Sequence, residues 1–330
     1  MTRQPANPIA VWTGILVLWV VWGSTYLGMK VAMDSLPPLV MGFFRFVPAG
    51  VLLAILVLAW NRGRVPRPAG RQLLDAAIVG TMLLVGGTGL VAWAEQSVPT
   101  GIAALLIGLV PMWLAIFGRV LFGERVTPIV AAGIVVGLAG VAILAWPSGD
   151  VGDMDPAGLV ALIVSPMFWS LGTHYAAKRA VLPAPALLAS ALEMIAAGLV
   201  FVVAAAVTGE WAGFDVGAVS TTSWQGIAYL VLVGSLVGYT TYAWLIQVAP
   251  LSRVSTYAYV NPVVAVILGG IILSEPFTAR TLVASVVIVA AVVLIVTGRG
   301  RDSRRDARER AASEATQASA AQPAPAEPAV

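Results

Sequence analysis

The sequence predicts an all-α membrane protein of ten transmembrane helices, arranged as two inverted repeats of five helices each. The first observation is composition: 59% of the residues are hydrophobic and 11% are charged, whereas about 25% of an ordinary soluble domain is charged. The second observation is a duplication. Landmarks of the first half return 151 residues later: Trp93 as Trp244, Gln96 as Gln247, Pro111 as Pro262, and Glu124 as Glu275.

The first repeat is expected over residues 9–146, after a short cytoplasmic N-terminus of residues 1–8. An apolar run of about 20 residues can cross a bilayer as a helix, which satisfies its own backbone hydrogen bonds. Five such runs follow one another: Ile9–Val31, Leu39–Trp60, Leu73–Ala94, Gly101–Phe122 and Ile129–Trp146. An extracytoplasmic linker of residues 147–155 then leads to the second repeat.

The second repeat is expected over residues 156–298. Its runs are Ala157–Ala177, Ala186–Val207, Trp224–Ile246, Val254–Leu273 and Leu282–Thr297. Because each repeat has an odd number of helices, the second repeat starts from the opposite side of the membrane, so the repeats are inverted. Such duplications are typical of transporters, whose substrate site lies where the repeats meet.

Basic residues indicate the orientation. Arginines crowd the loop around Arg67, Lys178 and Arg179 lie in another loop, and further arginines run from Arg299 to Arg310. An alternating path of ten helices puts all three groups on one side, which the positive-inside bias identifies as cytoplasmic. Both termini are therefore expected in the cytoplasm. The net charge of +3 then favours contact with the anionic leaflet of membrane lipid and not with nucleic acid.

The end of the chain, residues 299–330, is basic and then rich in Ala, Ser, Gln, Pro and Glu. Such a composition cannot bury a core, so the sequence predicts disorder over Asp302–Val330. The chain contains no cysteine, which excludes disulfides and cysteine metal ligands.

Several motifs resemble those of a known family. The first half contains Trp22-Gly23-Ser24-Thr25-Tyr26, Arg45-Phe46, and a stretch from Pro111 to Gly123-Glu124-Arg125; the second contains Tyr257-Ala258-Tyr259-Val260-Asn261-Pro262 and Ser274-Glu275-Pro276. Over about residues 9–298 the chain resembles EamA-family transporters of the drug/metabolite transporter superfamily. The resemblance implies export of small metabolites or amino acids across a bacterial inner (plasma) membrane.

Arg45 and Glu193 are the first candidate substrate or coupling residues. They occupy equivalent repeat positions, 148 residues apart, and each lies well inside its apolar run. Charges at such depth are costly and usually face a cavity or a partner. In inverted repeats they would lie at different depths, so a substrate or a water-filled path would separate them. The alternative is that each charge is satisfied locally in packing.

Aromatic and amide side chains form the second candidate group. Trp22 and Tyr26 share a helix face, as do Tyr239 and Tyr242, and as do Tyr257 and Asn261. These side chains, together with Trp93, Trp169, His174, Tyr175 and Trp244, are expected to line a central cavity. Anchoring at the membrane interface is the competing interpretation, and it is strongest at the ends of the runs.

Pro111 and Pro262 are hinge candidates, because a proline inside a helix removes one backbone hydrogen bond; a static kink is the alternative. Glu124 and Glu275 are expected to cap the helices that follow them. Glu95 and Lys30 are expected to form an interfacial pair or two solvated helix ends. The one histidine, His174, has no partner acids nearby in sequence, so no metal site and no cofactor are predicted.

These observations together predict a secondary transporter that exports a small organic solute by alternating access, and not an enzyme. No Walker phosphate-binding loop is present, so protons or a substrate gradient are the candidate driving forces. Uptake or uniport of a metabolite is the alternative within transport. An integral membrane enzyme, or a binding protein for lipid-linked ligands, is the alternative from another class. Two Gly-x-x-x-Gly pairs, Gly133 with Gly137 and Gly234 with Gly238, leave a homodimer open.

Overall fold

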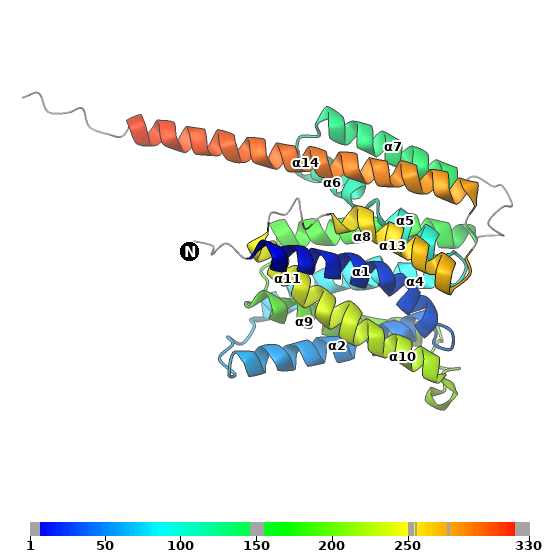
Figure 1. Cartoon of the computed structure of the whole chain (residues 1–330). Helices are drawn as coiled ribbons and strands as arrows, with labels where there is room; N and C mark the ends of the chain where they lie inside the picture. Colours follow the sequence, from blue (N-terminus) through cyan, green and yellow to red (C-terminus); the bar gives the residue numbers. More distant parts are fainter. Residues whose placement is uncertain (1–6, 146–154, 250–253, 255, 276–277, 321–330) are drawn as a thin grey trace, which may run out of the picture.

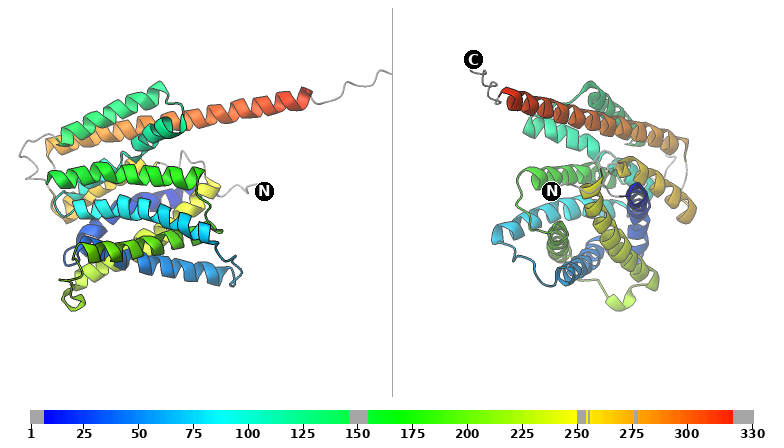
Figure 2. Two further views of the ribbon diagram at one scale, coloured as in Figure 1. Left: turned by 180° about the vertical axis from the view of Figure 1, so that it is seen from behind. Right: turned by 60° about the vertical axis from the view of Figure 1, so that its left-hand side comes forward.

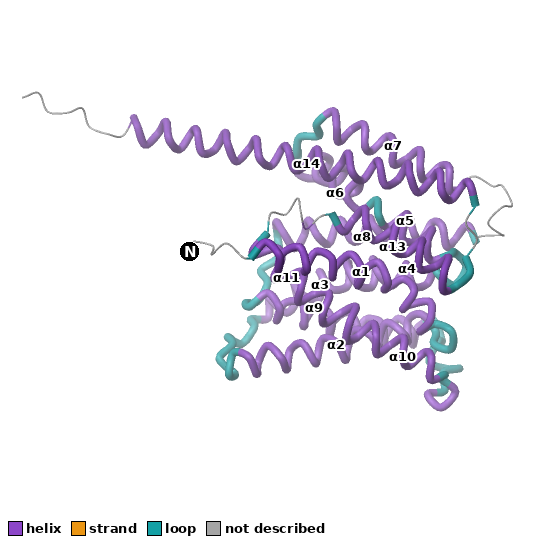
Figure 3. The backbone as a smooth tube through the Cα atoms, viewed as in Figure 1, coloured by secondary structure: helices purple, strands orange, loops and turns teal. Residues whose placement is uncertain are grey.

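The computed structural model describes residues 7–145, 155–249, 254, 256–275 and 278–320. Within these ranges the chain is helical and forms no strand, and short loops join the helices (Figure 3). Seven helical segments are long and apolar enough to cross a membrane, and two shorter apolar helices accompany them. The predicted all-α membrane class is confirmed. The count of ten helices in two inverted repeats stays a prediction.

The helices of the first half agree closely with the predicted runs. They are α1 (Pro8–Ala32), α2 (Pro38–Trp60), α3 (Gly70–Gly80), the π-helical η1 (Thr81–Gly89), α4 (Leu90–Ala94), α5 (Thr100–Ile107), α6 (Val110–Phe122) and α7 (Pro128–Ala145). Prolines at the first positions of α1 and α2 fit a helix start, where the missing N–H has no helical partner. Asn7 also caps α1, because its side chain accepts from the amide of Ile9 at 2.9 Å.

The helices of the second half follow the same order. They are α8 (Pro156–Lys178), α9 (Ala186–Val207), the short 3₁₀ turn η2 (Val216–Ala218), α10 (Thr221–Tyr229), the π-helical η3 (Leu230–Val237), α11 (Gly238–Val248), α13 (Tyr257–Ile272) and α14 (Ala279–Ala320). Asp155 caps α8 by accepting from the amide of Ala157 at 2.9 Å.

The helices lie lengthwise beside one another, and helices of the two halves interleave (Figures 1 and 2). α2 packs on α9, α1 packs on α13 and on α10 and α11, and α8 packs on η1 and α4. α7 and α14 form a pair at the upper edge of Figure 1. The α2–α9 and α7–α14 pairs each join one helix from either half, α1 packs mainly on helices of the second half, and α8 packs on helices of the first half.

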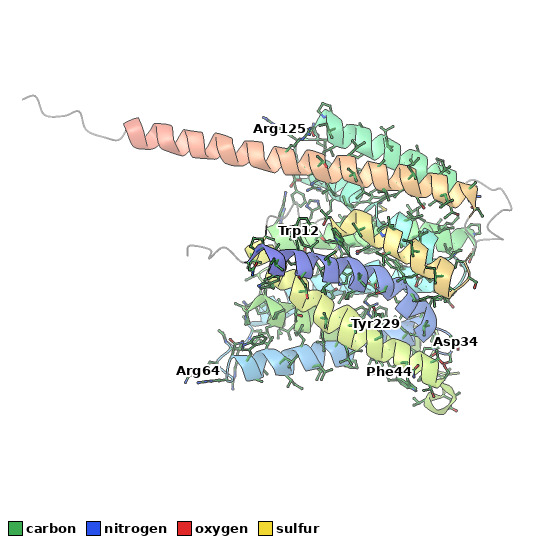
Figure 4. The ribbon with its side chains drawn as sticks, in the orientation of Figure 1. Trp12, Asp34, Phe44, Arg64, Arg125 and Tyr229 are labelled. Atoms are coloured by element: carbon green, nitrogen blue, oxygen red, sulfur yellow. The ribbon has the colours of Figure 1, made fainter. Side chains whose placement is uncertain are left out.

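The bundle has two ends, which we name after two glutamates. The Glu124 end holds the loop between α6 and α7, and the start of α1 and the far part of α14 also lie toward it (Figure 1). The Glu275 end holds the loops that follow α1, α4 and α13. Figure 4 shows Arg64 and Arg125 toward the Glu124 end and Asp34 toward the opposite end. The predicted clustering of basic loops at one end is therefore seen in the fold.

Two π-helical segments, η1 and η3, interrupt matching helices of the two halves. Residues 81–89 shifted by 151 become 232–240, which overlap η3. A π-helix leaves carbonyl groups out of register, and in η1 the Ser165 hydroxyl of α8 donates to the carbonyl of Gly87 at 2.9 Å. Hydrophobicity carries no signal for this change of register, so sequence analysis missed both segments.

The two proline positions differ. The helix breaks between Ile107 and Val110, just before Pro111, whereas α13 continues through Pro262. The α-carbon of Gly108 at the break faces the ring of Pro262, which leaves no room for a β-carbon there. The break in one half thus packs directly on the proline of the other half. Whether either proline acts as a hinge stays a prediction.

The tail requires a correction. α14 continues to Ala320, so the predicted disorder of residues 302–320 is wrong for this structure. The physical reason is propensity, because Ala, Arg and Glu are strong helix formers and neither proline nor glycine interrupts residues 301–320. Residues 321–330 of the predicted tail lie outside the described residues.

Candidate functional site

An aromatic group lies where α1, α11 and α13 meet. The ring of Trp22 contacts those of Tyr239, Tyr242 and Tyr257, with centroid separations of 6.0, 5.3 and 4.9 Å. Tyr242 and Tyr257 also contact each other at 6.2 Å. Four of the candidates from sequence analysis, which come from both halves of the chain, are thus brought together.

Arg45 of α2 lies buried beside this group. Its residue is 6% exposed, and its Nε and Nη1 atoms have no hydrogen-bond partner among the described residues. The guanidinium carbon lies 4.8 Å from the ring centre of Phe46 and is within electrostatic range of Tyr239, Glu95 and Tyr26. A buried cation with free donors is costly unless another group meets it. The Arg45 site therefore has the chemistry to receive an anion.

Glu193 of α9 is also within electrostatic range of Tyr239. It is partly buried, and it makes no ion pair or side-chain hydrogen bond in the part of the chain that the structure describes. Its backbone carbonyl packs against Gly80, directly before η1. Tyr239 is within electrostatic range of both Arg45 and Glu193, which do not pair with each other. No ion pair therefore joins the two charges in the described part of the chain, and their role in substrate or proton handling stays a prediction.

Tyr26 and Asn261 have different surroundings. Tyr26 is partly buried against the main core, within electrostatic range of Arg45 and Glu95. Asn261 is 9% exposed. With its amide nitrogen directed inward, it donates to the carbonyls of Trp19 and Tyr257, both at 3.2 Å. Asn261 therefore fastens α13 to α1, and these two bonds use both of its donors.

The remaining aromatic candidates lie elsewhere. Trp93 and Trp244 are 39% and 37% exposed, which fits interfacial anchoring better than a central position. His174 bonds to the carbonyl of Leu114 at 3.0 Å. Tyr175 donates to Asp75 at 2.7 Å. The second predicted group therefore divides into a central cluster and peripheral side chains.

Asp75 is a structural residue that sequence analysis missed. It is fully buried and accepts from Arg71 Nε at 2.9 Å, from the Tyr175 hydroxyl at 2.7 Å, and from the amide of Val181 at 2.8 Å. These bonds tie α3 to α8 and to the loop that follows α8. The only sequence signal is an acid near the start of an apolar run, with an arginine four residues earlier.

Glu275 caps a helix of the other half, which corrects the expectation that it caps the helix after it. Its carboxylate accepts from the amide and hydroxyl of Thr100, both at 2.7 Å, and from the amide of Gly101 at 3.1 Å. These groups form the start of α5, where amides lack helical partners and a negative charge is favoured. We call this arrangement the Glu275 cap. The helix after Glu275 is capped by Thr278, which accepts from the amide of Thr281 at 3.1 Å.

Glu124 has charged side chains as partners instead. Lys178 Nζ lies 2.5 Å and Arg299 Nη2 lies 3.8 Å from its carboxylate, at a partly exposed site. Burial alone would raise the pKa of Glu124, but the hydrogen bond and charge of Lys178, with Arg299, lower that pKa below its ordinary value. Glu124 was expected to cap the following helix, α7. Among the described residues its side chain makes no hydrogen bond to the start of α7.

Glu95 and Lys30 do not form the solvated or side-chain pair that the sequence favours. Lys30 Nζ donates to the backbone carbonyl of Glu95 at 2.5 Å. The Glu95 side chain is 0% exposed, and neither carboxylate oxygen has a hydrogen-bond partner among the described residues. A carboxyl group in such surroundings is unusual, because buried polar atoms are normally satisfied. Within the same residues no group of three or more His, Cys, Asp or Glu gathers as a metal site.

Comparison with known proteins places the chain in a family. The EamA-like transporter family matches residues 10–146 and 156–297. The uncharacterized inner membrane transporter YedA of Escherichia coli K12 is 37% identical over 287 residues, which cover 86% of this chain and 90% of YedA. A probable terminal-alkyne amino-acid exporter of Streptantibioticus cattleyicolor is 30% identical over 306 residues, which cover 91% of this chain and 98% of the exporter.

A solved crystal structure with 20% sequence identity superposes with a TM-score of 0.59, over 88% of this chain and 96% of that chain, which supports the fold alone. The family match spans most of the chain, and it confirms the resemblance drawn from the motifs around Trp22, Arg45, Glu124 and Asn261. The chain belongs to the EamA-like transporter family.

Proposed function

We propose that this chain is a secondary transporter of ten helices in two inverted repeats, which exports a small metabolite or amino acid from the cytoplasm by alternating access. It would lie in a bacterial inner membrane with both termini inside. The interleaved packing of the halves and the matching η1 and η3 segments support the repeats. The basic residues at the Glu124 end, where α1 also begins, support the orientation.

One observation carries the proposal: among the described residues, the buried Arg45 has donors without partners beside an aromatic group, and the carboxylate of Glu193, which makes no ion pair there, is within electrostatic range of the same Tyr239. Arg45 suits a carboxylate, because its guanidinium offers donors in a planar fork. The carboxylate of Glu193 suits an ammonium group. The rings of Trp22, Tyr242 and Tyr257 offer apolar surface to the rest of the solute. This arrangement complements a zwitterion, the class to which an amino acid belongs.

The similar exporter from Streptantibioticus is named for an amino acid, which agrees with this cargo class. Uptake or uniport would use the same side chains and differs only in direction. A membrane enzyme or a binding protein for lipid-linked ligands would need its reactive or binding groups at one membrane face. Arg45 and its aromatic neighbours Trp22, Tyr239, Tyr242 and Tyr257 lie instead within helices α1, α2, α11 and α13, which favours transport.

Binding tests the proposal directly. We expect amino acids, titrated as a panel against purified protein, to change the fluorescence of Trp22 and its neighbours. Arg45→Gln should weaken this binding at least about tenfold, which corresponds to about 1.4 kcal/mol for a lost charged hydrogen bond. Arg179→Gln, at an exposed position, is the matched control and should bind normally. Equal affinity in the two variants would contradict the proposed role of Arg45.

The orientation has its own test. Because the chain contains no cysteine, a single introduced cysteine can be labelled from one side of the membrane. We expect cysteines near Arg67 and Lys178 to react from the cytoplasmic side and one near Asp215 to react from outside. Reaction of the Lys178 and Asp215 positions from the same side would contradict the inverted-repeat proposal.

A further inference from the structure

Glu95 has surroundings that the proposed binding site does not explain. It directly follows α4 and is closed off from solvent, yet no donor meets its two carboxylate oxygens in the described part of the chain. An ionised carboxylate is strongly destabilised by burial unless hydrogen bonds or a close cation compensate it. The arrangement therefore fits a carboxyl group that carries a proton.

The charged and titratable groups around Glu95 come from three elements. Lys30 and Tyr26 belong to α1, Arg45 belongs to α2, and Glu275 follows α13. Lys30 directs its ammonium at the backbone carbonyl of Glu95 and makes no ion pair with its carboxylate. The negative charge of Glu275 opposes ionisation of Glu95, while Lys30 and Arg45 favour it. Burial has the largest effect, so the pKa of Glu95 is well above its ordinary value.

Glu95 is joined to the Glu275 cap by a short segment of chain. Thr100, which bonds to Glu275, lies five residues after Glu95, and Val98 between them is 1% exposed. Glu275 meets three donors at the start of α5, whereas Glu95 meets none. The Glu275 end thus holds one carboxylate that meets three donors and one that, among the described residues, meets none. Separation of α5 from Glu275 would admit water to Glu95 and allow it to ionise beside Lys30.

We propose that Glu95 is a proton-binding site, and that the Glu275 end of the bundle closes only when this proton is bound. The proposal rests on the proposed alternating access, in which the two ends of the bundle close in turn, and it assigns proton binding to closure of the Glu275 end. The closed state binds one more proton than the open state at pH values between the two pKa values of Glu95. Closure is therefore favoured as pH falls, and opening is favoured as pH rises through this range.

The experiment uses the full chain with one reporter, Val98→Cys, in an otherwise cysteine-free protein. A thiol reagent reaches this buried position only when the Glu275 end opens. Rates are measured across pH with Glu95 intact and with Glu95→Gln, which mimics the protonated side chain. Thiol reactivity itself changes with pH. The quantity compared at each pH is therefore the rate with Glu95 intact divided by the rate with Glu95→Gln. Glu275→Gln, which weakens the cap, serves as the open control and should react faster.

We expect the ratio to rise with pH by up to about tenfold per pH unit, as release of one proton requires. Glu95→Asp should keep the dependence, because it keeps the titratable group. A ratio that stays constant with pH would overturn the proposal. So would a rate that changes when sodium replaces potassium at constant pH, since the site would then bind a metal cation.

Infrared spectroscopy gives a readout that depends neither on the reporter nor on a cargo. The wild-type protein should show a protonated carboxyl band at neutral pH that Glu95→Gln loses and that Asp34→Asn, at an exposed position, keeps. A spectrum unchanged by Glu95→Gln would contradict the proton site. Because no solute is added, this result is independent of the binding test of the proposed function.

Discussion

The two ends of the bundle contain the same short motif but use it differently. At each end the backbone amide of a glutamate donates to the carbonyl of a glycine six residues earlier: Glu124 to Gly118 at 3.0 Å, and Glu275 to Gly269 at 3.2 Å. The Glu275 carboxylate then binds the backbone start of α5, whereas the Glu124 carboxylate binds two partly exposed cationic side chains, Lys178 and Arg299. Similar sequence therefore forms a helix cap at one end and two partly exposed ion pairs at the other.

The lysines of the two ends differ in the same way. Lys178 bonds to the carboxylate of Glu124, whereas its counterpart Lys30, 148 residues earlier, bonds to the backbone carbonyl of Glu95. A structure in which both ends were equivalent would show the same partners twice. The same motif thus binds a helix start at one end and partly exposed cations at the other, an asymmetry that the proposed alternating access would use.

The largest expected difference between the ends is in stability. Glu275→Ala should lower the free energy of unfolding by about 2–3 kcal/mol, because donors at the start of α5 lose a charged acceptor. Glu124→Ala should cost at most about 1 kcal/mol, because its ion pairs are partly exposed to solvent. Thermal unfolding of the two purified variants in one detergent measures the difference. Equal losses would mean that the two ends are held equally strongly.

The glycines of the motif should show a smaller difference. A β-carbon at Gly269 would meet both the Glu275 carboxylate and the Thr100 hydroxyl, whereas one at Gly118 would meet the partly exposed carboxylate of Glu124. Alanine in a helix otherwise gains about 1 kcal/mol over glycine. Gly118→Ala should therefore be neutral or stabilising in unfolding, and Gly269→Ala should be destabilising. The comparison is refuted if Gly118→Ala is the more harmful change.

The smallest effect concerns pH at the Glu124 end. The pKa of Glu124 is lowered in the folded chain, so its ion pair stabilises the fold above the unfolded pKa and is lost as pH falls through the folded pKa. Lys178→Gln should cost under about 1 kcal/mol at neutral pH and nothing at acid pH. Unfolding followed across this pH range, with Arg179→Gln as control, measures the effect. A cost for Lys178→Gln that persists at acid pH would assign Lys178 a different role.

Sequence predicted the helices well because length and hydrophobicity decide them. The run Ala186–Val207 coincides with α9, and Leu39–Trp60 differs from α2 by one residue. Hydrogen bonds between residues far apart in the chain could not be predicted, for example that between Glu275 and Thr100, which are separated by 175 residues. The duplication made Glu124 and Glu275 look equivalent, so both were expected to cap the helix that follows them, although their partners differ.

The candidate site was predicted in part for the same reason. A costly charge in an apolar run stands out, so Arg45 and Glu193 were found. Glu95 lies at the end of its run, where hydrophobicity cannot tell a buried carboxylate from a solvated one. Ser24 and Tyr229 illustrate a packing contact that no pattern signals: their hydroxyls meet at 2.5 Å between α1 and α10, at the position labelled in Figure 4.

Flux through the purified chain is the most direct test of the account. Proteoliposomes loaded with unlabelled amino acid should take up the same amino acid in radiolabelled form by exchange. Wild type and Arg179→Gln should exchange it at equal rates per inserted molecule, and Arg45→Gln should exchange it at least about tenfold more slowly, since the carboxylate loses its charged partner. No exchange of any amino acid by the wild type, or normal exchange by Arg45→Gln, would contradict an amino-acid transporter built around Arg45.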